Sequence, residues 1–195
     1  MPPLPPATKV LMLFCTAMFC IDLLTPIEMW LALWPIGSGR FGPWQLLTYA
    51  FLHADMMHLF FNMLGLWMFG AELERLWGQK RYLQMLLASV LAAAVVQLAF
   101  NLFFGSMRPT VGASGALFGL LLAFGMLFPN RTIMPLFPPI PMKARTFVAV
   151  FGALELLLGL QGPSGVAHFA HLGGMLGAWL MMLYWRGRLP FGGRR

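Results

Sequence analysis

The stretch Gly112-Ala113-Ser114-Gly115 opens an apolar run that ends near Phe128. Its small side chains would let neighbouring helices approach the backbone closely. Backbone N–H groups at the start of a helix lack an intrahelical partner and favour negative charge. A hydroxyl beside such donors meets the needs of a serine nucleophile and of the oxyanion it forms. Fold and function therefore depend on which residues the rest of the chain brings to Ser114.

The composition indicates an integral membrane protein. Of the 195 residues, 59% are hydrophobic and only 10% are charged, whereas about a quarter of the residues in a soluble domain are charged. The apolar residues form long runs rather than amphipathic stripes. The length suits a single domain, residues 1–195. The net charge of +7 is scattered through short segments between the runs, so no nucleic-acid partner is expected, because that binding gathers basic residues on one face.

The fold class predicted from these runs is all-α, a polytopic membrane protein with six transmembrane helices. We expect the spans near residues 8–25, 57–72, 82–104, 114–128, 146–161 and 165–185, separated by charges, Pro and Gly. The run from Val10 to Leu24 lacks a following signal-peptide cleavage site and is interpreted as a retained span. Cys15 and Cys20 lie on different faces of it, so neither a disulfide nor a metal pair is expected.

Basic residues predict the orientation of the spans. Six spans put both termini on one side, and the positive-inside rule makes that side the cytoplasm. It holds the N-terminus (about 1–8), residues 73–81 and 129–145, and the tail (about 186–195). Its basic residues are Lys9, Arg75, Lys80, Arg81, Arg131, Lys143, Arg145, Arg186, Arg188, Arg194 and Arg195, against Arg40 and Arg108 outside. The first outer loop, residues 26–56, is rich in aromatic residues and is expected in the membrane interface.

Three polar residues are predicted to lie at one depth in the membrane. The second, fourth and sixth spans run inward, so depth can be measured from their cytoplasmic ends. At ~1.5 Å per residue, Ser114 and His171 lie about 21 Å from that end and His58 about 20 Å. Asn62 lies one turn deeper than His58 on the same helix face. Because the fourth span is too short to cross fully, residues 105–113 are expected to dip inward and line a wet cavity.

Small residues predict that the fourth and sixth spans touch. Each span carries a pair of small residues four apart, placed just after Ser114 in one span and just after His171 in the other. The pairs are Gly115 with Gly119 and Gly174 with Ala178. Such pairs let two helix backbones approach closely. The contact would bring Ser114 to His171, which we expect to act as its general base.

The remaining polar residues leave alternatives open. His58 and Asn62 offer N–H donors to an oxyanion, although a pair of interhelical hydrogen bonds would also account for them. His168 is expected to be structural and His53 interfacial. Three histidines could hold zinc, with His53 and Asp55 as extra ligands if the loop folds inward. Their spacing matches no recognised ligand motif, so no metal and no organic cofactor is expected.

Glu155 is the one carboxylate inside a predicted span, and the sequence gives it no evident partner. It is expected to be protonated and hydrogen-bonded, or to brace neighbouring helices. No acidic residue is expected at the level of His171 on a neighbouring helix, which favours a Ser–His dyad and leaves a triad open. Glu72 and Glu74 flank Arg75 and are expected to form surface or loop-fixing pairs.

Together these motifs resemble the rhomboid family of intramembrane serine proteases, in its minimal six-helix bacterial form. The motifs, within residues 8–185, are Gly112-Ala113-Ser114-Gly115, Ala170-His171-Leu172-Gly173-Gly174, His58-Leu59-Phe60-Phe61-Asn62, Phe51-Leu52-His53, Glu74 and Gly78. The resemblance implies that Ser114 is the nucleophile and His171 the base. It implies an oxyanion hole of His58, Asn62 and the Ser114 N–H. An aromatic ring often stacks on the catalytic histidine in the family, and Phe118 occupies that place.

The function implied by the resemblance is that of a serine endopeptidase cleaving transmembrane segments of membrane-protein substrates. Its partners would be those substrates and membrane lipids. It would lie in a bacterial inner (plasma) membrane, with the active site opening to the outer side. Some relatives carry Trp-Arg where this chain has Trp44-Gln45, so no role transfers for that Arg. Two alternatives stay open: an inactive rhomboid-like protein that binds transmembrane helices, and a carrier that binds metal through its histidine cluster.

Overall fold

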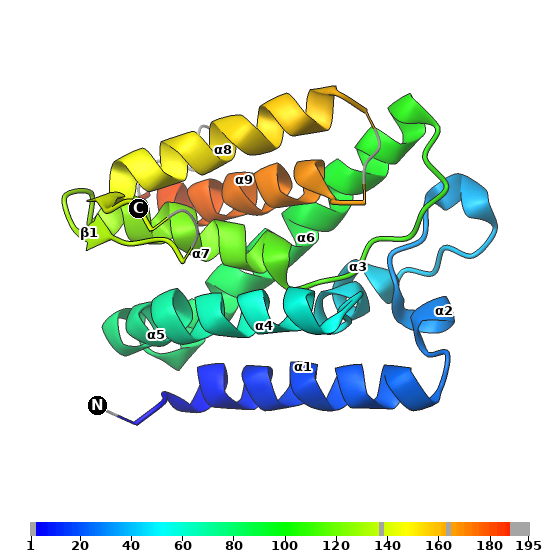
Figure 1. Cartoon of the computed structure of the whole chain (residues 1–195), viewed down its shortest axis with the longest axis horizontal. Coiled ribbons are helices and arrows are strands. Elements are labelled where there is room, and N and C mark those ends of the chain that lie inside the picture. The colour runs from blue at the N-terminus through cyan, green and yellow to red at the C-terminus, as the bar shows by residue number, and fades with distance from the viewer. Residues whose placement is uncertain (1–2, 137–138, 163–164, 188–195) are drawn as a thin grey trace.

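The computed structural model describes residues 3–136, 139–162 and 165–187, most of which are helical (Figure 1). The longer helices are α1 (Pro6–Leu24), α4 (Met56–Gly65), α5 (Ala71–Trp77), α6 (Gln79–Phe104), α7 (Ser114–Leu127), α8 (Ala144–Leu160) and α9 (His168–Trp185). A π-helical turn, η3 (Leu66–Gly70), joins α4 to α5. Shorter elements are α2 (Glu28–Leu31), η1 (Ile36–Ser38), α3 (Gln45–Thr48), η2 (Tyr49–Phe51) and an antiparallel pair of strands, β1 (Thr132–Ile133) and β2 (Met142–Lys143).

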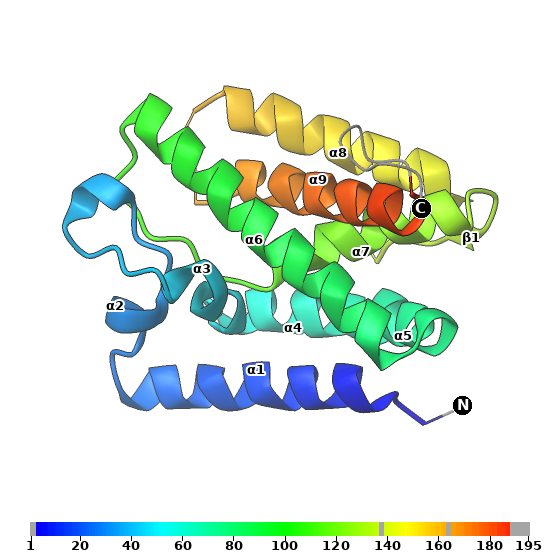
Figure 2. The ribbon, with the colours of Figure 1, turned by 180° about the vertical axis from the view of Figure 1, so that it is seen from behind.

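The long helices form a bundle with α7 at its centre. In Figure 1, α1 lies along one edge, α4 and α5 come next, and α9 and then α8 lie on the other side of α7. Helix α6 runs diagonally across the back of the bundle, as Figure 2 shows. The start of α1 and the end of α9 lie at the same end of the molecule in both views. The site is therefore built where α4, α7 and α9 lie beside one another.

Each of the six predicted apolar runs contains a helix, which confirms the all-α prediction. The second run does not end at 72 but continues through η3 and α5 to Trp77, because the first residue that breaks it is Gly78, at a φ of 77°. Helix α9 begins at His168 rather than at 165. Among the described residues, α1 and α6 are long and apolar enough to cross a membrane, and α7 is a shorter apolar helix. The count of six membrane spans stays a prediction.

Large apolar side chains face outward on the flank helices. On α1, Leu23 and Leu24 are 70% and 85% exposed, and on α6 Phe103 is 89% exposed. Soluble monomers rarely expose apolar surface on this scale. Cys15 is buried, Cys20 is exposed, and both are free cysteines. The sequence likewise predicts no disulfide between them. The outward apolar surface fits a protein surrounded by lipid.

Glycines let α9 pack against the backbones of α6 and α7. A Cβ added to Gly174 would lie 1.8 Å from the carbonyl oxygen of Gly115, and one added to Gly119 would lie 2.9 Å from that of Gly174. On the α6 side, a Cβ on Gly177 would lie 2.4 Å from the carbonyl oxygen of Ala88. No side chain fits at these distances. The predicted close approach of the fourth and sixth spans is confirmed.

Two acidic side chains, buried Glu74 and partly exposed Glu72, join helix ends and loops to one another. Glu74 accepts hydrogen bonds from the backbone N–H groups of Ala7 and Thr8, at 2.9 and 2.7 Å, and so satisfies free donors at the start of α1. Glu72 pairs with Arg131 across the bundle. Both acidic residues thus fix loops and helix ends, as predicted. The predicted cytoplasmic arginines Arg188, Arg194 and Arg195 lie outside the described residues.

The first long connection, residues 25–55, positions the start of α7. Thr110 exchanges backbone hydrogen bonds with Leu33, each 3.0 Å long, and the N–H of Gly112 donates to the carbonyl oxygen of Tyr49 at 2.9 Å. These bonds hold the extended segment 105–113 against the connection. The segment is green in Figure 1 and leads from the end of α6 back into the bundle. The segment therefore returns the chain from the end of α6 into the bundle before α7 begins at Ser114. This agrees with the inward dip that a short fourth span is predicted to need.

Substitution Gly174→Ala tests the contact between α7 and α9. We expect it to lower the free energy of unfolding by about 1–3 kcal/mol, because the added methyl group overlaps the backbone of Gly115. Gly152→Ala is the matched control, since its Cβ would meet only the end of the Met175 side chain, at 3.4 Å. Thermal unfolding in detergent micelles measures both. Equal melting temperatures for the two variants would contradict the contact.

Candidate active site

A cavity of about 620 Å³ brings together the side chains that the sequence predicts to be functional. Ser114, His171, His58 and Asn62 all line it. They come from the start of α7, the first turn of α9 and the first two turns of α4. Residues of the segment 105–113, of α6 and of the connection from α8 to α9 also line it. The predicted wet cavity around Ser114 therefore has a counterpart in the structure.

Ser114 and His171 are in direct contact. The Oγ of Ser114 lies 2.8 Å from Nε2 of His171, which is hydrogen-bond distance. Phe118, one turn after Ser114, stacks on the imidazole with ring centroids 4.3 Å apart and planes 5° apart. The stacked ring limits the orientations open to His171. A hydroxyl held in this way beside a buried imidazole can lose its proton to Nε2 when it attacks an electrophile.

Gln97, a residue the sequence reasoning passed over, anchors the start of α9. Its Oε1 accepts a hydrogen bond from the backbone N–H of Ala170, at 3.1 Å, and its Nε2 donates to Oδ1 of Asn101 at 3.0 Å. The side chain of Gln97 is buried. It fixes the backbone next to His171. A polar residue in the middle of an apolar run was the signal that could have identified it.

His58 presents one ring nitrogen to the space beside Ser114. The carboxylate of Asp55 caps α4 by accepting from the backbone N–H of His58 at 2.8 Å. The N–H of Ala54 donates to Nδ1 of His58 at 3.4 Å, so in a neutral ring the proton is on Nε2. A Cβ on Gly112 would lie 2.7 Å from that Nε2 and 3.6 Å from Oγ of Ser114. The donor of His58 thus faces the predicted position of an oxyanion.

Asn62 lines the same cavity one turn further along α4. Its Nδ2 donates to the carbonyl oxygen of His58 at 2.8 Å, and its Oδ1 is buried without a partner. The amide has a second N–H, which this bond leaves available. The bond lies within α4, so the alternative of an interhelical hydrogen bond does not describe this contact. The structure brings Asn62 to the cavity with one donor already engaged.

Glu155 of α8 lies against His171, and the expectation that no acidic residue reaches this histidine is wrong. Its Oε2 is 2.8 Å from Nδ1 of His171 and 2.7 Å from Nδ1 of His168. Glu155 lies on the fifth predicted span, which runs outward and therefore does not share the depth scale of the second, fourth and sixth spans. Glu155 is five residues before the end of α8 and His171 three after the start of α9, or about 7.5 and 4.5 Å from the connection between them.

The other two histidines, His53 and His168, are both buried next to a site histidine or its partner. His168 is buried and bound to Glu155, so it has a defined partner. His53, which is predicted to lie at the membrane interface, is 2% exposed, with its ring centroid 5.2 Å from that of His58. Burial and the neighbouring His58 lower the pKa of His53 to about 4, so the ring is neutral at pH 7. Its side chain fills space behind His58.

A set of possible metal ligands exists, but it differs from the set of histidines that the zinc alternative considered. In the described part of the chain, donor atoms of Glu155, His168 and His171 lie within 4.8 Å of one another. Two imidazoles and a carboxylate are donors that zinc accepts. The carboxylate oxygen is, however, hydrogen-bonded to Nδ1 of His168 and lies 2.8 Å from Nδ1 of His171, so direct contacts between the side chains account for the cluster. Asp55, which the zinc alternative would use as an extra ligand if the loop folded inward, caps α4.

Comparison with known proteins decides the family. A family model described as the Rhomboid domain matches residues 40–188. The chain belongs to the rhomboid family. Rhomboid protease GluP of Bacillus subtilis (strain 168) is 32% identical over 134 residues, which is 69% of this chain and 24% of that protein. Rhomboid protease GlpG of Yersinia pestis (strain Pestoides F) is 28% identical over 185 residues, which is 92% of this chain and 62% of that protein.

A mitochondrial relative also matches this rhomboid chain. Rhomboid protein 1, mitochondrial, of Saccharomyces cerevisiae (strain ATCC 204508 / S288c) is 36% identical over 98 residues, 47% of this chain and 27% of that protein. The chain spans between about a quarter and just under two thirds of the length of these three relatives. What it shares with them is thus a rhomboid domain rather than the whole of each protein.

Gln45 follows Trp44 in this rhomboid, where some relatives have the arginine of a Trp-Arg pair. The side chain is buried and its Oε1 accepts from the backbone N–H of Trp34 at 3.1 Å. Its Nε2 donates to the carbonyl oxygens of Trp30 and Arg40, at 3.2 and 3.0 Å. Gln45 therefore joins the turns of the first long connection to one another. This is a structural role that the sequence did not indicate.

Substitution Gly112→Ala tests the space between His58 and Ser114. The added Cβ would occupy the predicted oxyanion position, so we expect the rate of labelling by a fluorophosphonate to fall by about 100-fold or more. Gly39→Ala is the control, because Gly39 also has a positive φ, 71°, but has open space around it. Gel fluorescence after timed labelling measures both. Unchanged labelling of Gly112→Ala would show that this space is not used.

Proposed function

We propose that this rhomboid is an intramembrane serine endopeptidase that cleaves transmembrane segments of membrane-protein substrates. The observation that supports this most strongly is the 2.8 Å contact between Ser114 Oγ and His171 Nε2 inside a cavity that His58 also lines. Membership of a family in which relatives are named rhomboid proteases supports it independently. The catalytic residues would be Ser114 and His171, with His58 and Asn62 stabilising the oxyanion.

Acylation would begin with attack of Ser114 Oγ on a peptide carbonyl carbon of the substrate. The hydroxyl proton passes to Nε2 of His171 as the new C–O bond forms. The carbonyl oxygen becomes an oxyanion, which the N–H donors of His58, Asn62 and the Ser114 backbone stabilise. Collapse of the tetrahedral intermediate breaks the C–N bond, and the leaving amine takes the proton from His171. The products are a free amine and an acyl ester on Ser114.

Deacylation would repeat these steps with water. Water enters the cavity, gives a proton to His171 and attacks the ester carbonyl carbon, and the oxyanion forms in the same place. Breakage of the ester bond returns the proton to Ser114 Oγ and releases a carboxylic acid. Every proton transfer uses a group already within the cavity, and the sequence requires no metal or cofactor for this chemistry.

The membrane setting is part of the proposal. Among the residues that the structure describes, α1 and α6 are long and apolar enough to span a membrane, and the flank helices expose apolar side chains. Both observations support an integral membrane protein in contact with lipid. The apolar runs favour six spans, and the distribution of basic residues favours both termini in the cytoplasm, with the cavity opening to the outer side. The proposed location is a bacterial inner membrane, as the resemblance to minimal bacterial rhomboids implies. Residues 1–195 would form a single rhomboid domain. A transmembrane substrate would reach Ser114 from the surrounding lipid.

Labelling and cleavage of a model transmembrane substrate test the proposal. Ser114→Ala should reduce both to background, and His171→Ala should do the same because the hydroxyl loses its base. His168→Ala should slow labelling without abolishing it, since His168 does not contact Ser114. Purified protein in detergent or proteoliposomes serves for both readouts.

The alternatives give different results in the same assay. A rhomboid-like protein that only binds helices would capture the substrate without cleaving it, and its fluorophosphonate labelling would not depend on His171. A metal carrier would be indifferent to Ser114→Ala and would lose metal binding in a chelator. Either result would overturn the assignment of a serine endopeptidase.

A further inference from the structure

We propose that Glu155 is a positioning residue that completes a Ser114–His171–Glu155 triad in this chain. The inference rests on the proposed function and deepens it, because a Ser–His dyad is what the sequence alone favours. The carboxylate oxygen Oε2 lies 2.8 Å from Nδ1 of His171, and Nε2 of the same ring lies 2.8 Å from Ser114 Oγ. Serine, imidazole and carboxylate thus follow one another in the order that a triad requires.

The carboxylate would select the tautomer that a general base needs. An acceptor beside Nδ1 favours the ring with its proton on Nδ1, and that tautomer leaves the lone pair of Nε2 facing the hydroxyl of Ser114. The opposite tautomer would point an N–H at the hydroxyl and could not accept its proton. Phe118 fixes the plane of the ring by stacking, but stacking does not choose between tautomers. Glu155 supplies this choice.

The contact has room to strengthen during the reaction. Although Oε2 is 2.8 Å from Nδ1, the two are not aligned as a hydrogen bond, whereas the contact with His168 is. When His171 takes the proton of Ser114, it becomes a cation next to the carboxylate. Both partners are about nine-tenths buried, so water screens their attraction little. An interaction stronger in the transition state than in the resting enzyme accelerates the chemical step.

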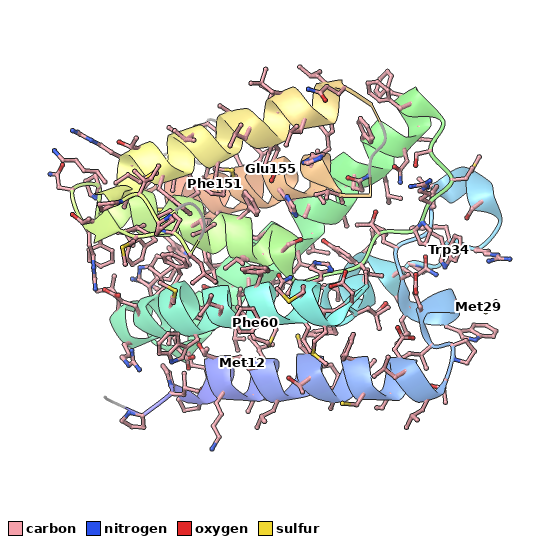
Figure 3. All side chains as sticks on the ribbon, viewed as in Figure 1. Met12, Met29, Trp34, Phe60, Phe151 and Glu155 are labelled. Carbon is pink, nitrogen blue, oxygen red and sulfur yellow. The ribbon has the colours of Figure 1, made fainter. Side chains whose placement is uncertain are left out.

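His168 and the packing of α8 on α9 hold the carboxylate in place. His168 Nδ1 binds the same oxygen of Glu155 at 2.7 Å from the other side. One turn after Glu155, a Cβ on Gly159 would lie 2.7 Å from the ring of Phe169 and 3.2 Å from Cβ of His168. The helices therefore approach closely at this level. Figure 3 labels Glu155 on α8, where the helix runs beside α9.

Glu155 comes from α8, a helix that contributes none of the other site residues. Ser114, His171, His58 and Asn62 belong to α7, α9 and α4. The triad is complete only while α8 stays packed on α9. The same three side chains could bind a metal ion, and the experiment must distinguish that use from a triad.

Steady-state kinetics of Glu155→Gln tests the triad. Glutamine keeps the shape and an acceptor oxygen but loses the charge, so kcat should fall by about 10- to 1,000-fold while KM changes by less than about 3-fold. Glu155→Asp, which restores the charge on a shorter side chain, should recover part of kcat. Glu72→Gln is the control, since it removes a carboxylate that pairs with Arg131 away from the cavity, and kcat should stay unchanged. Melting temperatures of all variants identify any that fail to fold.

The outcomes distinguish failure of the triad from failure of the protease proposal. If the wild type cleaves, Ser114→Ala does not, and Glu155→Gln keeps the wild-type kcat, the triad is overturned and the protease proposal stands. If Glu155→Gln loses activity only in proportion to folded protein, and Glu155→Asp does not recover it, Glu155 is structural and the triad is likewise overturned. Inhibition of the wild type by 1,10-phenanthroline that Zn²⁺ reverses would assign the cluster to a metal instead. A wild type that neither cleaves nor reacts with a fluorophosphonate would overturn both proposals.

Discussion

The contact between the backbones of Gly115 and Gly174 is the constraint on which the site depends. In a bilayer, lipid tails are as apolar as the helices, so close packing rather than water exclusion has to hold α7 to α9. The absence of side chains at these two positions lets the backbones touch. Ser114 immediately precedes one glycine, and His171 lies three residues before the other. Their 2.8 Å contact is therefore a consequence of how the two helices pack.

Polar groups inside this apolar bundle form hydrogen bonds and ion pairs with one another because water is excluded from its interior. Gln97 binds the backbone at the start of α9, Asp55 caps α4, and Glu155 lies between two histidines. Each of these contacts anchors an element that carries a site residue. Gln97 joins α6 to α9, Asp55 fixes the first turn of α4, and Glu155 joins α8 to α9. The same interactions that satisfy buried polar groups thus fix the geometry of Ser114, His171 and His58.

The features that could be predicted from the sequence are those that a helical period or a residue type fixes locally. Small residues four apart predicted the α7–α9 contact. A count of residues per span predicted that Ser114, His58 and His171 lie at one depth in the membrane. Contacts that depend on which antiparallel helices become neighbours were missed. Glu155 is the clearest case: its residue type marked it as unusual, but only the packing of α8 beside α9 gives it His171 as a partner. The packing of the His53 ring against His58 was likewise not evident from the sequence.

The structure of a covalent adduct with a fluorophosphonate would test the central claim most directly. The account predicts a bond from phosphorus to Ser114 Oγ. The phosphoryl oxygen should occupy the space between Gly112 and Nε2 of His58, where an oxyanion would form. The imidazole of His171 should stay stacked on Phe118 with Glu155 beside Nδ1. An adduct on another residue, or a phosphoryl oxygen turned away from His58 toward lipid, would contradict it.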